Sequence, residues 1–484
     1  MTIKDLQPNV VWSNFYGLTQ VPRPSKHEAK VQEYLLKWGE EHGVEVFRDD
    51  TGNIIFRKDA TPGMENRRGV ILQGHMDMVP QKTGDSTHNF ITDPINTIID
   101  GDWVTADRTT LGADNGIGVA MGLSVLEDPT VKHGPVEVLV TYDEETGMTG
   151  ANSLKPGVLK GDILINLDSE EEGELCVGCA GGLDASADFK YRTYKTPEDY
   201  AGCTILVSGL QGGHSGMDIS LYRANANKVV TRMLLPLVEK YGALVSDFNG
   251  GSLRNAIPFE ARAVFAVPAK KAAAAKKEIE KVWAEVKNEF VDSDPGMVLE
   301  VKKTAAPERH IQPSVMLRAL KALLACPAGV IRMSRTMEGL TETSTNMAIV
   351  RTGNGHLTVH SLMRSAVDSS KAYLAERMRC LFELAGAEIT FAGGYSGWTP
   401  KLDTPMNKVM MDQFKKVYGY DMKIMATHGG LECAIMGAKY PNWEMVSVGP
   451  TVKFPHSPDE KVNIPSVART WEYLKAVLEA VPEK

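Results

Sequence analysis

The chain has 484 residues, of which 43% are hydrophobic and 24% charged, and its formal net charge is −8 at pH 7. A chain of this length is too long for a single core, so we expect more than one domain. The charge is spread without a basic stripe, which argues against a nucleic-acid partner. Because the sequence shows neither a secretory signal nor 18 consecutive apolar residues, we expect a cytoplasmic protein without membrane contact.

Helix and strand patterns alternate over the first 170 residues. Residues 25–43 carry apolar side chains at helical spacing, and Ser25 and Glu28 are spaced as a capping box. A second helix is predicted over 115–129, ended by Pro129. Short apolar runs predict strands at 70–72, 136–142, 163–167 and 443–449. Strands that alternate with helices indicate an α/β fold with a mostly parallel sheet.

The middle of the chain, residues 183–396, has a different pattern. Strands such as "CTILVSG", "ARAVFAV" and "HLTVHSLM" are interrupted by helices such as "AAAAKKEIEKVWAEVKNEF". This order predicts an antiparallel sheet with helices on one face, which is an α+β domain inserted into the first one. We therefore expect one domain formed by 1–182 and 397–484, with a second domain over 183–396 inserted into it.

Ligand-type side chains follow the predicted strands of the first domain. In open α/β sheets, ligands bind at the carboxyl ends of the strands, so these side chains should converge. A mixed set of histidines and carboxylates suits Zn²⁺, Mn²⁺ or Co²⁺ better than Mg²⁺ or Ca²⁺. Each residue alone has a structural alternative, such as a helix N-cap for Asp114 or a solvated turn for the glutamates. The set comprises His75, Asp77, Asp114, Asp143, Glu144, Glu145, Asp168 and His456.

An ordered series of motifs runs along nearly the whole chain. It comprises "GHMDMVP", "TTLGADNGIG", "TYDEETGMTGA", "INLDSEEEGE", "QGGHSGMDI", "FNGGSLRNAIP", "HSLMRSAVDS", "THGGLECAI" and "FPHSPDE". Together these motifs resemble the M20 metallopeptidases. Within that family they resemble the bacterial aminoacyl-histidine dipeptidases, also called cytosol nonspecific dipeptidases, which are relatives of carnosinase.

The resemblance implies two divalent metal ions, with Zn²⁺ expected and Mn²⁺ or Co²⁺ as alternatives. Asp114 would bridge the two ions, and the peptide bond to Asn115 would be cis. The remaining ligands would be His75 and Asp168 for one ion, and Glu145 and His456 for the other.

Two further acidic residues complete the expected chemistry of the metal centre. Two divalent ions can share a water, lower its pKa and polarise a substrate carbonyl. Glu144 is the candidate general base that takes the proton from this water and returns it to the leaving amine. Asp77 is the expected partner that orients the imidazole of His75.

The resemblance implies that 183–396 is the family's lid domain, and that 1–182 with 397–484 is its catalytic domain. Four residues match positions that family members present to the substrate. His214 would stabilise the oxyanion, Asn255 and Arg364 would hold the substrate carboxylate, and Gly430 would allow close backbone approach. The residues alone are also compatible with a loop histidine, a turn asparagine and a solvated arginine. In much of the family the histidine reaches the site of a neighbouring subunit, and we expect a homodimer.

The expected function is metal-dependent hydrolysis of dipeptides with a free C-terminal carboxylate. A preference for a C-terminal histidine is implied by the resemblance alone. The alternative is an M20-type deacylase of N-acyl amino acids, which hydrolysis of acetylated amino acids would distinguish. A dinucleotide site is disfavoured because Gly112, Gly116 and Gly118 do not follow the GxGxxG order.

Overall fold

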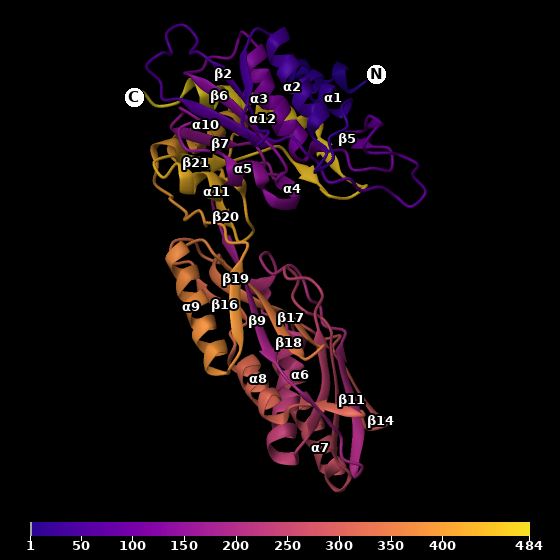
Figure 1. Ribbon diagram of the computed structural model, residues 1–484. Helices are drawn as coiled ribbons and strands as arrows, with labels where there is room; N and C mark the ends of the chain where they lie inside the picture. Colours follow the sequence, from indigo (N-terminus) through magenta and orange to yellow (C-terminus); the bar gives the residue numbers. More distant parts are fainter. Residues whose placement is uncertain (1) are drawn as a thin grey trace. The chain divides into compact units, whose positions relative to one another are not determined.

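The structure is a computed structural model that describes residues 2–484, and the chain divides into two compact units (Figure 1). Unit 2 comprises Cys179–Thr399 together with the short segment Thr427–Gly430. Unit 1 comprises the chain through Gly178, then Pro400–Ala426 and Leu431–Lys484. The main segment of unit 2 runs from 179 to 399, whereas the sequence predicted 183 to 396. Unit 2 also includes residues 427–430, which were not predicted to belong to it.

Unit 1 is built on a mixed eight-stranded sheet in the order β1-β2-β6-β3-β7-β21-β8-β20. The central strands β6, β3, β7 and β21 are parallel, whereas β1 and β2 on one side and β8 on the other pair antiparallel. The strand bounds are Glu45–Arg48, Ile54–Lys58, Val136–Thr141, Val70–His75, Ile163–Asn166, Glu444–Ser447, Glu174–Cys179 and Lys423–Thr427, in sheet order.

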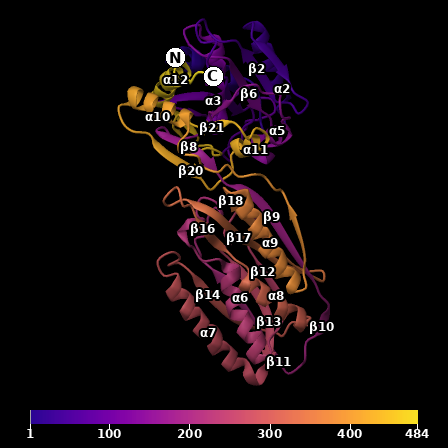
Figure 2. The same ribbon diagram turned by 90° about the vertical axis from the view of Figure 1, so that its left-hand side faces the viewer.

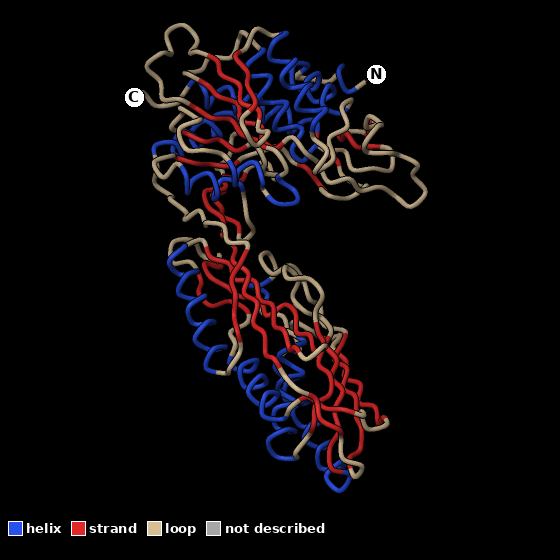
Figure 3. The backbone as a smooth tube through the Cα atoms, in the orientation of Figure 1, coloured by secondary structure: helices blue, strands red, loops and turns tan. Residues whose placement is uncertain are grey.

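Continuous burial explains why the central strands read as unbroken apolar runs. Every residue of β3, β6 and β7 is buried, because both faces of the sheet are covered. Strand residues that include Val70 and Ile165 belong to one core together with residues of α1, α2, α3, α10 and α12. Figure 3 shows the helices around the strands of unit 1. The helices of unit 1 are α1 (Asn9–Thr19), α2 (Ala29–Glu41), α3 (Ala113–Glu127), α4 (Glu144–Gly147), α5 (Thr149–Ser153), α10 (Pro405–Tyr418), α11 (Glu432–Lys439) and α12 (Ile464–Glu479).

The helix predicted from residue 25 begins later than expected. Helix α2 starts at Ala29, and its N-cap residue Glu28 makes no side-chain cap. The hydroxyl of Ser25 instead donates a hydrogen bond of 2.9 Å to Asp77 Oδ2. The capping-box prediction was therefore wrong, because Ser25 serves the carboxylate of Asp77 and not the helix.

Unit 2 contains an antiparallel sheet in the order β14-β11-β13-β12-β17-β18-β9-β19, with β16 paired to β17. Helices α6, α7, α8 and α9 cover one face of this sheet (Figures 1 and 2). The helices span Ala226–Pro236, Ala272–Glu289, Pro313–Ala325 and Asp368–Leu384. In sheet order the strands span Val298–Thr304, Tyr200–Ser208, Ala261–Pro268, Leu244–Gly250, Thr341–Gly353, His356–Ser365, Gly181–Lys190 and Glu388–Ala392, and β16 spans Gly329–Met333. The predicted α/β fold with an inserted α+β domain is confirmed.

Two small sheets complete the fold. One is β22-β23-β5-β4 in unit 1, and the other pairs β10 with β15 in unit 2. The strands of these two sheets span, in the order named, Val452–Lys453, Lys461–Asn463, Trp103–Ala106, Thr97–Asp100, Thr193–Lys195 and Arg309–Ile311.

None of the helices in residues 2–484 is long and apolar enough to cross a membrane.

Candidate active site

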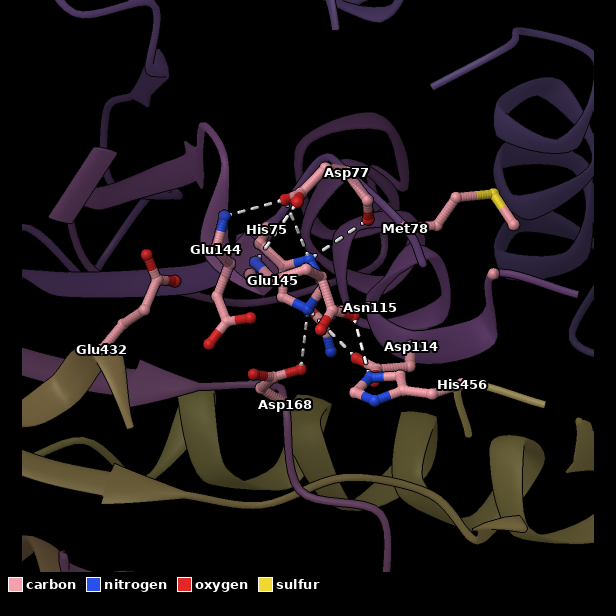
Figure 4. Close-up of polar contacts among 12 residues, drawn as sticks. His75, Asp77, Met78, Asp114, Asn115, Glu144, Glu145, Asp168, Glu432 and His456 are labelled. Carbon is pink, nitrogen blue, oxygen red and sulfur yellow. Dashed lines mark hydrogen bonds and ion pairs between the residues drawn. The ribbon is translucent and has the colours of Figure 1, made fainter. Parts of the chain in front are cut away.

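The five predicted metal ligands form one cluster in unit 1, drawn in Figure 4. His75 ends strand β3, and its Nε2 lies 3.0 Å from Asp114 Oδ1 and 3.4 Å from Asp168 Oδ1. The Nε2 of His456 lies 3.0 Å from Asp114 Oδ2 and 3.0 Å from Glu145 Oε1. Asp114 therefore directs one carboxylate oxygen to each histidine, which is the arrangement that a bridging ligand requires.

Burial of this cluster fits a cation. Asp168 Oδ1 is buried, and its ion pair with His75 Nε2, at 3.4 Å, is longer than a charge-assisted hydrogen bond. His75, Asp114 and Glu145 each offer a ligand atom within 4.8 Å of the others. Three carboxylates and two imidazoles together match the donor preferences of Zn²⁺, Mn²⁺ and Co²⁺.

Charge in the cluster is balanced by the two histidines. Hydrogen bonds to Asp114 and Glu145 raise the pKa of His456 to about 11. Burial alone lowers the pKa of His75, but the negative charge of Asp168 and the bond to Asp114 raise it well above the ordinary value. Burial raises the pKa of Asp168 to about 6. A divalent ion would take over the positive charge that these two imidazolium groups provide.

Asp114 lies at a kink in α3, where the backbone is not helical, and its carboxylate contacts His75 and His456. The N-cap of α3 is Gly112, and the peptide bond from Asp114 to Asn115 is cis. The amide of Asn115 donates 2.8 Å to the carbonyl of Leu167, the residue before Asp168. This bond ties the loop of the bridging residue to the end of strand β7.

Glu460 fixes the same loop from the other side, and sequence reasoning missed it. Its carboxylate accepts from the backbone N–H groups of Leu111, Gly112 and Asp114, at 2.8, 3.0 and 3.1 Å. Burial raises the pKa of Glu460 to about 7. Its only sequence signal was its place in "FPHSPDE", four residues after His456.

Asp77 connects His75 to the turn that carries the two glutamates. Its Oδ1 lies 3.4 Å from His75 Nδ1 and accepts the backbone N–H of Glu144 at 3.0 Å. Its Oδ2 accepts the backbone N–H of Glu145 at 3.3 Å. His75 Nδ1 also lies 3.2 Å from the backbone carbonyl of Asp77, with which it forms a hydrogen bond. Burial favours the neutral acid, yet His75, the N–H of Glu144 and the hydroxyl of Ser25 lower the pKa of Asp77. One carboxylate thus orients an imidazole and a turn together.

Arg23 supports this region and was not predicted. It is only 2% exposed, and its guanidinium donates to the carbonyls of Met76 and Asp77 at 3.1 Å each and to that of Gly112 at 2.5 Å. It therefore joins the loops of Asp77 and Asp114.

The turn that presents Glu144 is anchored through Asp143. Asp143 has a positive φ of 52°, and its carboxylate accepts from Lys26 Nζ at 2.6 Å and from the hydroxyls of Thr146 and Thr149. The side chain of Glu144 faces the cluster in Figure 4. Burial, opposed by the charge of His75, raises its pKa well above the ordinary value. A carboxylate with a raised pKa is suited to proton transfer near neutral pH.

Glu432 is a buried carboxylate beside this site that sequence reasoning did not assign. Its Oε2 accepts from Gln73 Nε2 at 2.6 Å and from the hydroxyl of Thr141 at 2.7 Å. Burial raises the pKa of Glu432 to about 8, and its charge also acts to raise the pKa of Glu144. The motif "THGGLECAI" contained it, but nothing in the pattern distinguished it from a surface glutamate.

The predicted substrate-binding residues lie in unit 2, where the loops of His214 and Asn255 are adjacent. The backbone N–H of Ser215 donates 2.8 Å to the carbonyl of Asn255, whose side chain is exposed. Nδ1 of His214 accepts from the N–H groups of Gly216 and Met217, at 3.2 and 3.1 Å. Burial and the charge of Arg364 lower the pKa of His214. The neutral ring therefore carries its hydrogen on Nε2, which makes it a donor.

Arg364 is a buried cation at the end of strand β18. It is 6% exposed, and its Nε and an Nη lie 3.4 Å from the hydroxyls of Ser215 and Tyr395. No acidic side chain among residues 2–484 forms an ion pair with it. A buried guanidinium without an anionic partner is unfavourable, so this group is suited to bind an anion.

The segment Thr427–Gly430 adds a histidine and a glycine to this part of unit 2. His428 Nε2 lies 2.7 Å from the hydroxyl of Ser344, and burial lowers the pKa of His428 to about 3, so it is a neutral hydrogen-bonded side chain. A Cβ added to Gly430 would lie 2.8 Å from the hydroxyl oxygen of Tyr395. The lack of a side chain at 430 therefore makes room for Tyr395.

Comparison with known proteins settles the family. Residues 71–480 match the description "Peptidase family M20/M25/M40". The chain belongs to this family. It is thus a peptide hydrolase, and the resemblance read from the motifs is confirmed.

Individual relatives agree with the family assignment. The cytosol non-specific dipeptidase of Escherichia coli (strain K12) is 42% identical over 100% of this chain and 99% of its own length. The crystal structure of the aminoacylhistidine dipeptidase from Vibrio alginolyticus is 45% identical, with a TM-score of 0.95 over 100% of this chain and 99% of that chain. A tripeptidase from Staphylococcus aureus shares 15% identity and a TM-score of 0.57 over 98% of this chain and 99% of that one, which shows likeness of fold alone.

Proposed function

We propose that the protein is a metal-dependent dipeptidase that acts on dipeptides with a free C-terminal carboxylate. Two features support the proposal, each within its own unit: a His and carboxylate cluster in unit 1, and in unit 2 a buried guanidinium without an ion pair among residues 2–484. The first suits hydrolysis of an amide, and the second suits recognition of a chain end. Both full-length relatives are named as dipeptidases.

The metal centre would be held by the five clustered residues of unit 1. Asp114 would bridge two divalent ions, His75 and Asp168 would hold one, and Glu145 and His456 the other. Bound there, the ions supply a water of lowered pKa and Lewis-acid polarisation of the scissile carbonyl. Zn²⁺ is our first choice, and Mn²⁺ or Co²⁺ would satisfy the same donors.

Proton transfer is assigned to Glu144. Its carboxylate is buried beside the ligands, and its backbone N–H is fixed by Asp77, so the turn holds the side chain in place. Glu144 takes a proton from the attacking water and returns it to the leaving amine. Asp77 acts through His75 and this turn, and is a positioning residue.

Substrate binding is assigned to unit 2. His214 would donate from Nε2 to the developing oxyanion, consistent with its neutral ring. Arg364, with Asn255, would bind the carboxylate of the substrate, and Gly430 would border the same place.

The proposal extends to the assembly and the location of the protein. We propose a homodimer, which light scattering of the purified protein would test. We also propose a cytoplasmic location, because the relative from Escherichia coli is named a cytosol dipeptidase.

The test of the function compares matched substrates. A dipeptide panel that includes β-Ala-His and Gly-His, each as free acid and as C-terminal amide, is assayed with chelated enzyme reloaded with Zn²⁺, Mn²⁺ or Co²⁺. We expect the parent to prefer the free acid strongly, and Arg364→Ala to lose about ten- to a hundred-fold in kcat/KM on the acid. Equal rates on acid and amide in the parent would contradict carboxylate recognition. Faster hydrolysis of N-acetyl amino acids would indicate the deacylase instead.

A further inference from the structure

Tyr395 occupies a defined place next to Arg364 in unit 2. Its backbone N–H donates 3.1 Å to the carbonyl of Gly182, and its own carbonyl accepts from Lys371 Nζ. A Cβ added to Gly182 would lie 2.6 Å from the tyrosine ring, and one added to Gly430 would lie 2.8 Å from its hydroxyl. Two bare backbone positions thus admit the ring and its hydroxyl, which fixes where the phenol lies.

The O–H group of Tyr395 is available as a hydrogen-bond donor. The guanidinium of Arg364 donates to it at 3.4 Å, so the phenol oxygen serves as acceptor in that contact. Among residues 2–484 the phenol O–H donates to no protein acceptor. Because Tyr395 is only partly buried, this O–H can donate to a ligand that enters beside Arg364. Burial raises the pKa of Tyr395, so the phenol keeps its proton at neutral pH.

The surroundings specify an anionic acceptor. Arg364 supplies positive charge, and the hydroxyl of Ser215 lies 3.4 Å from its Nε. The nearby histidines add no charge at neutral pH, because burial and the charge of Arg364 lower the pKa values of both His214 and His428. The unused donors around Arg364 are therefore set for a carboxylate and not for a cation or an apolar side chain.

We propose that Tyr395 is a substrate-binding residue whose phenol O–H donates, together with Arg364, to the carboxylate of the dipeptide. The proposal rests on the proposed function, because it names a second donor for the group that Arg364 binds. The proposal also explains why residues 182 and 430 are glycines, because side chains at these positions would displace the phenol.

Tyr395→Phe tests the donor without removing the ring. The matched control is Tyr373→Phe on α9 in the same unit, because Tyr373 is 67% exposed. KM and kcat are measured for one dipeptide as free acid and as C-terminal amide, and melting temperatures are recorded for all three proteins. We expect Tyr395→Phe to raise KM for the acid about tenfold with kcat retained, and to reduce the preference for acid over amide. Tyr373→Phe should behave as the parent.

The outcomes separate this inference from the proposed function. If the parent prefers the acid and Tyr395→Phe keeps the same KM and the same ratio, Tyr395 does not bind the carboxylate, and the proposed function stands. If acid and amide lose activity equally through kcat or through a lowered melting temperature, Tyr395 only supports the fold. If the parent itself shows no preference, carboxylate recognition fails as a whole, and Tyr395 fails with it.

Discussion

At the scale of single residues, the site combines groups whose burial is compensated locally. The carboxylate of Asp77 accepts two backbone N–H groups, and that of Glu460 accepts three. These bonds could not be predicted from the sequence, because the donors come from loops that are far away in the chain.

The expected ligands His75 and Asp168 could be proposed because they lie at the ends of strands, and Asp114 and Glu145 because they lie near helix starts. His456 lies in the loop between β22 and β23, and its motif was the main signal. Glu432 and Arg23 could not be proposed, because their contacts arise only from tertiary packing.

Glu144 and Glu145 are expected to have different roles, and substituting each of them by glutamine distinguishes proton transfer from metal binding. Glu144→Gln should lose about 10²- to 10⁴-fold in kcat while the protein still binds about two metal ions, because Glu144 is assigned to proton transfer. Glu145→Gln should weaken metal binding, because Glu145 lies 3.0 Å from His456 beside the bridging carboxylate. Elemental analysis of the dialysed proteins gives the metal content. The assignment is reversed if Glu144→Gln loses metal and Glu145→Gln retains it.

Metal binding should release protons from the histidines. Without metal, His456 with its pKa of about 11 and His75 with its raised pKa are both protonated at pH 7. A ligand imidazole must be neutral, so the apparent affinity should rise with pH, about tenfold per unit for each proton displaced. Titration calorimetry with Zn²⁺ in two buffers of different ionisation enthalpy counts these protons. His456→Ala should release fewer protons, and identical heats in both buffers would show that the histidines are already neutral.

At the scale of elements, the spacing of apolar residues predicted the strands that are made of apolar residues, but it did not predict a strand that buries polar side chains. Strands β3, β6 and β7 were predicted from their apolar runs. Strand β17, Thr341–Gly353, was not, although it lies inside the sheet of unit 2. It buries Thr343, Ser344 and Asn346, whose side chains bond to Ser365, to His428 and to backbone carbonyls. Such a strand is stabilised by hydrogen bonds across it, so its sequence lacks the apolar alternation that indicates a strand.

Helix α8 in unit 2 offers a prediction at this scale. Lys228 on α6 donates to the last carbonyls of α8, at 2.7 Å to Leu323 and 2.9 Å to Leu324, and also to Cys326. Lys228→Met should cost about 1–3 kcal/mol, because these carbonyls lose their donor. For a unit of this size the melting temperature should fall by roughly 2–4 °C per kcal/mol. The control is Lys321→Met on α8 itself, because the Lys321 side chain is 57% exposed and forms an ion pair with Glu239. Equal melting temperatures for the two variants would show that the carbonyls are satisfied without Lys228.

At the scale of the whole molecule, the sequence indicated the insertion but not its outer limits. The change of pattern near 183 and 396 reflects a change from parallel to antiparallel pairing, which alters the spacing of apolar residues. The segment 427–430 has no such signal, because it is too short to show a period, and it joins unit 2 through backbone bonds from Ala180 to the carbonyls of Thr427 and Gly429.

The two units have separate apolar cores, and all five proposed ligands belong to unit 1. A ligand that binds only the folded state stabilises the part that forms its site, by about 2.7 kcal/mol at a hundred times its Kd. We therefore expect two calorimetric transitions, of which one rises in temperature with added Zn²⁺ and falls with chelator, while the other stays within a degree or so. His75→Ala should abolish the metal-dependent shift, and Lys228→Met should move the other transition. A single transition that shifts as one with metal would mean that the units unfold cooperatively, which would overturn their energetic independence.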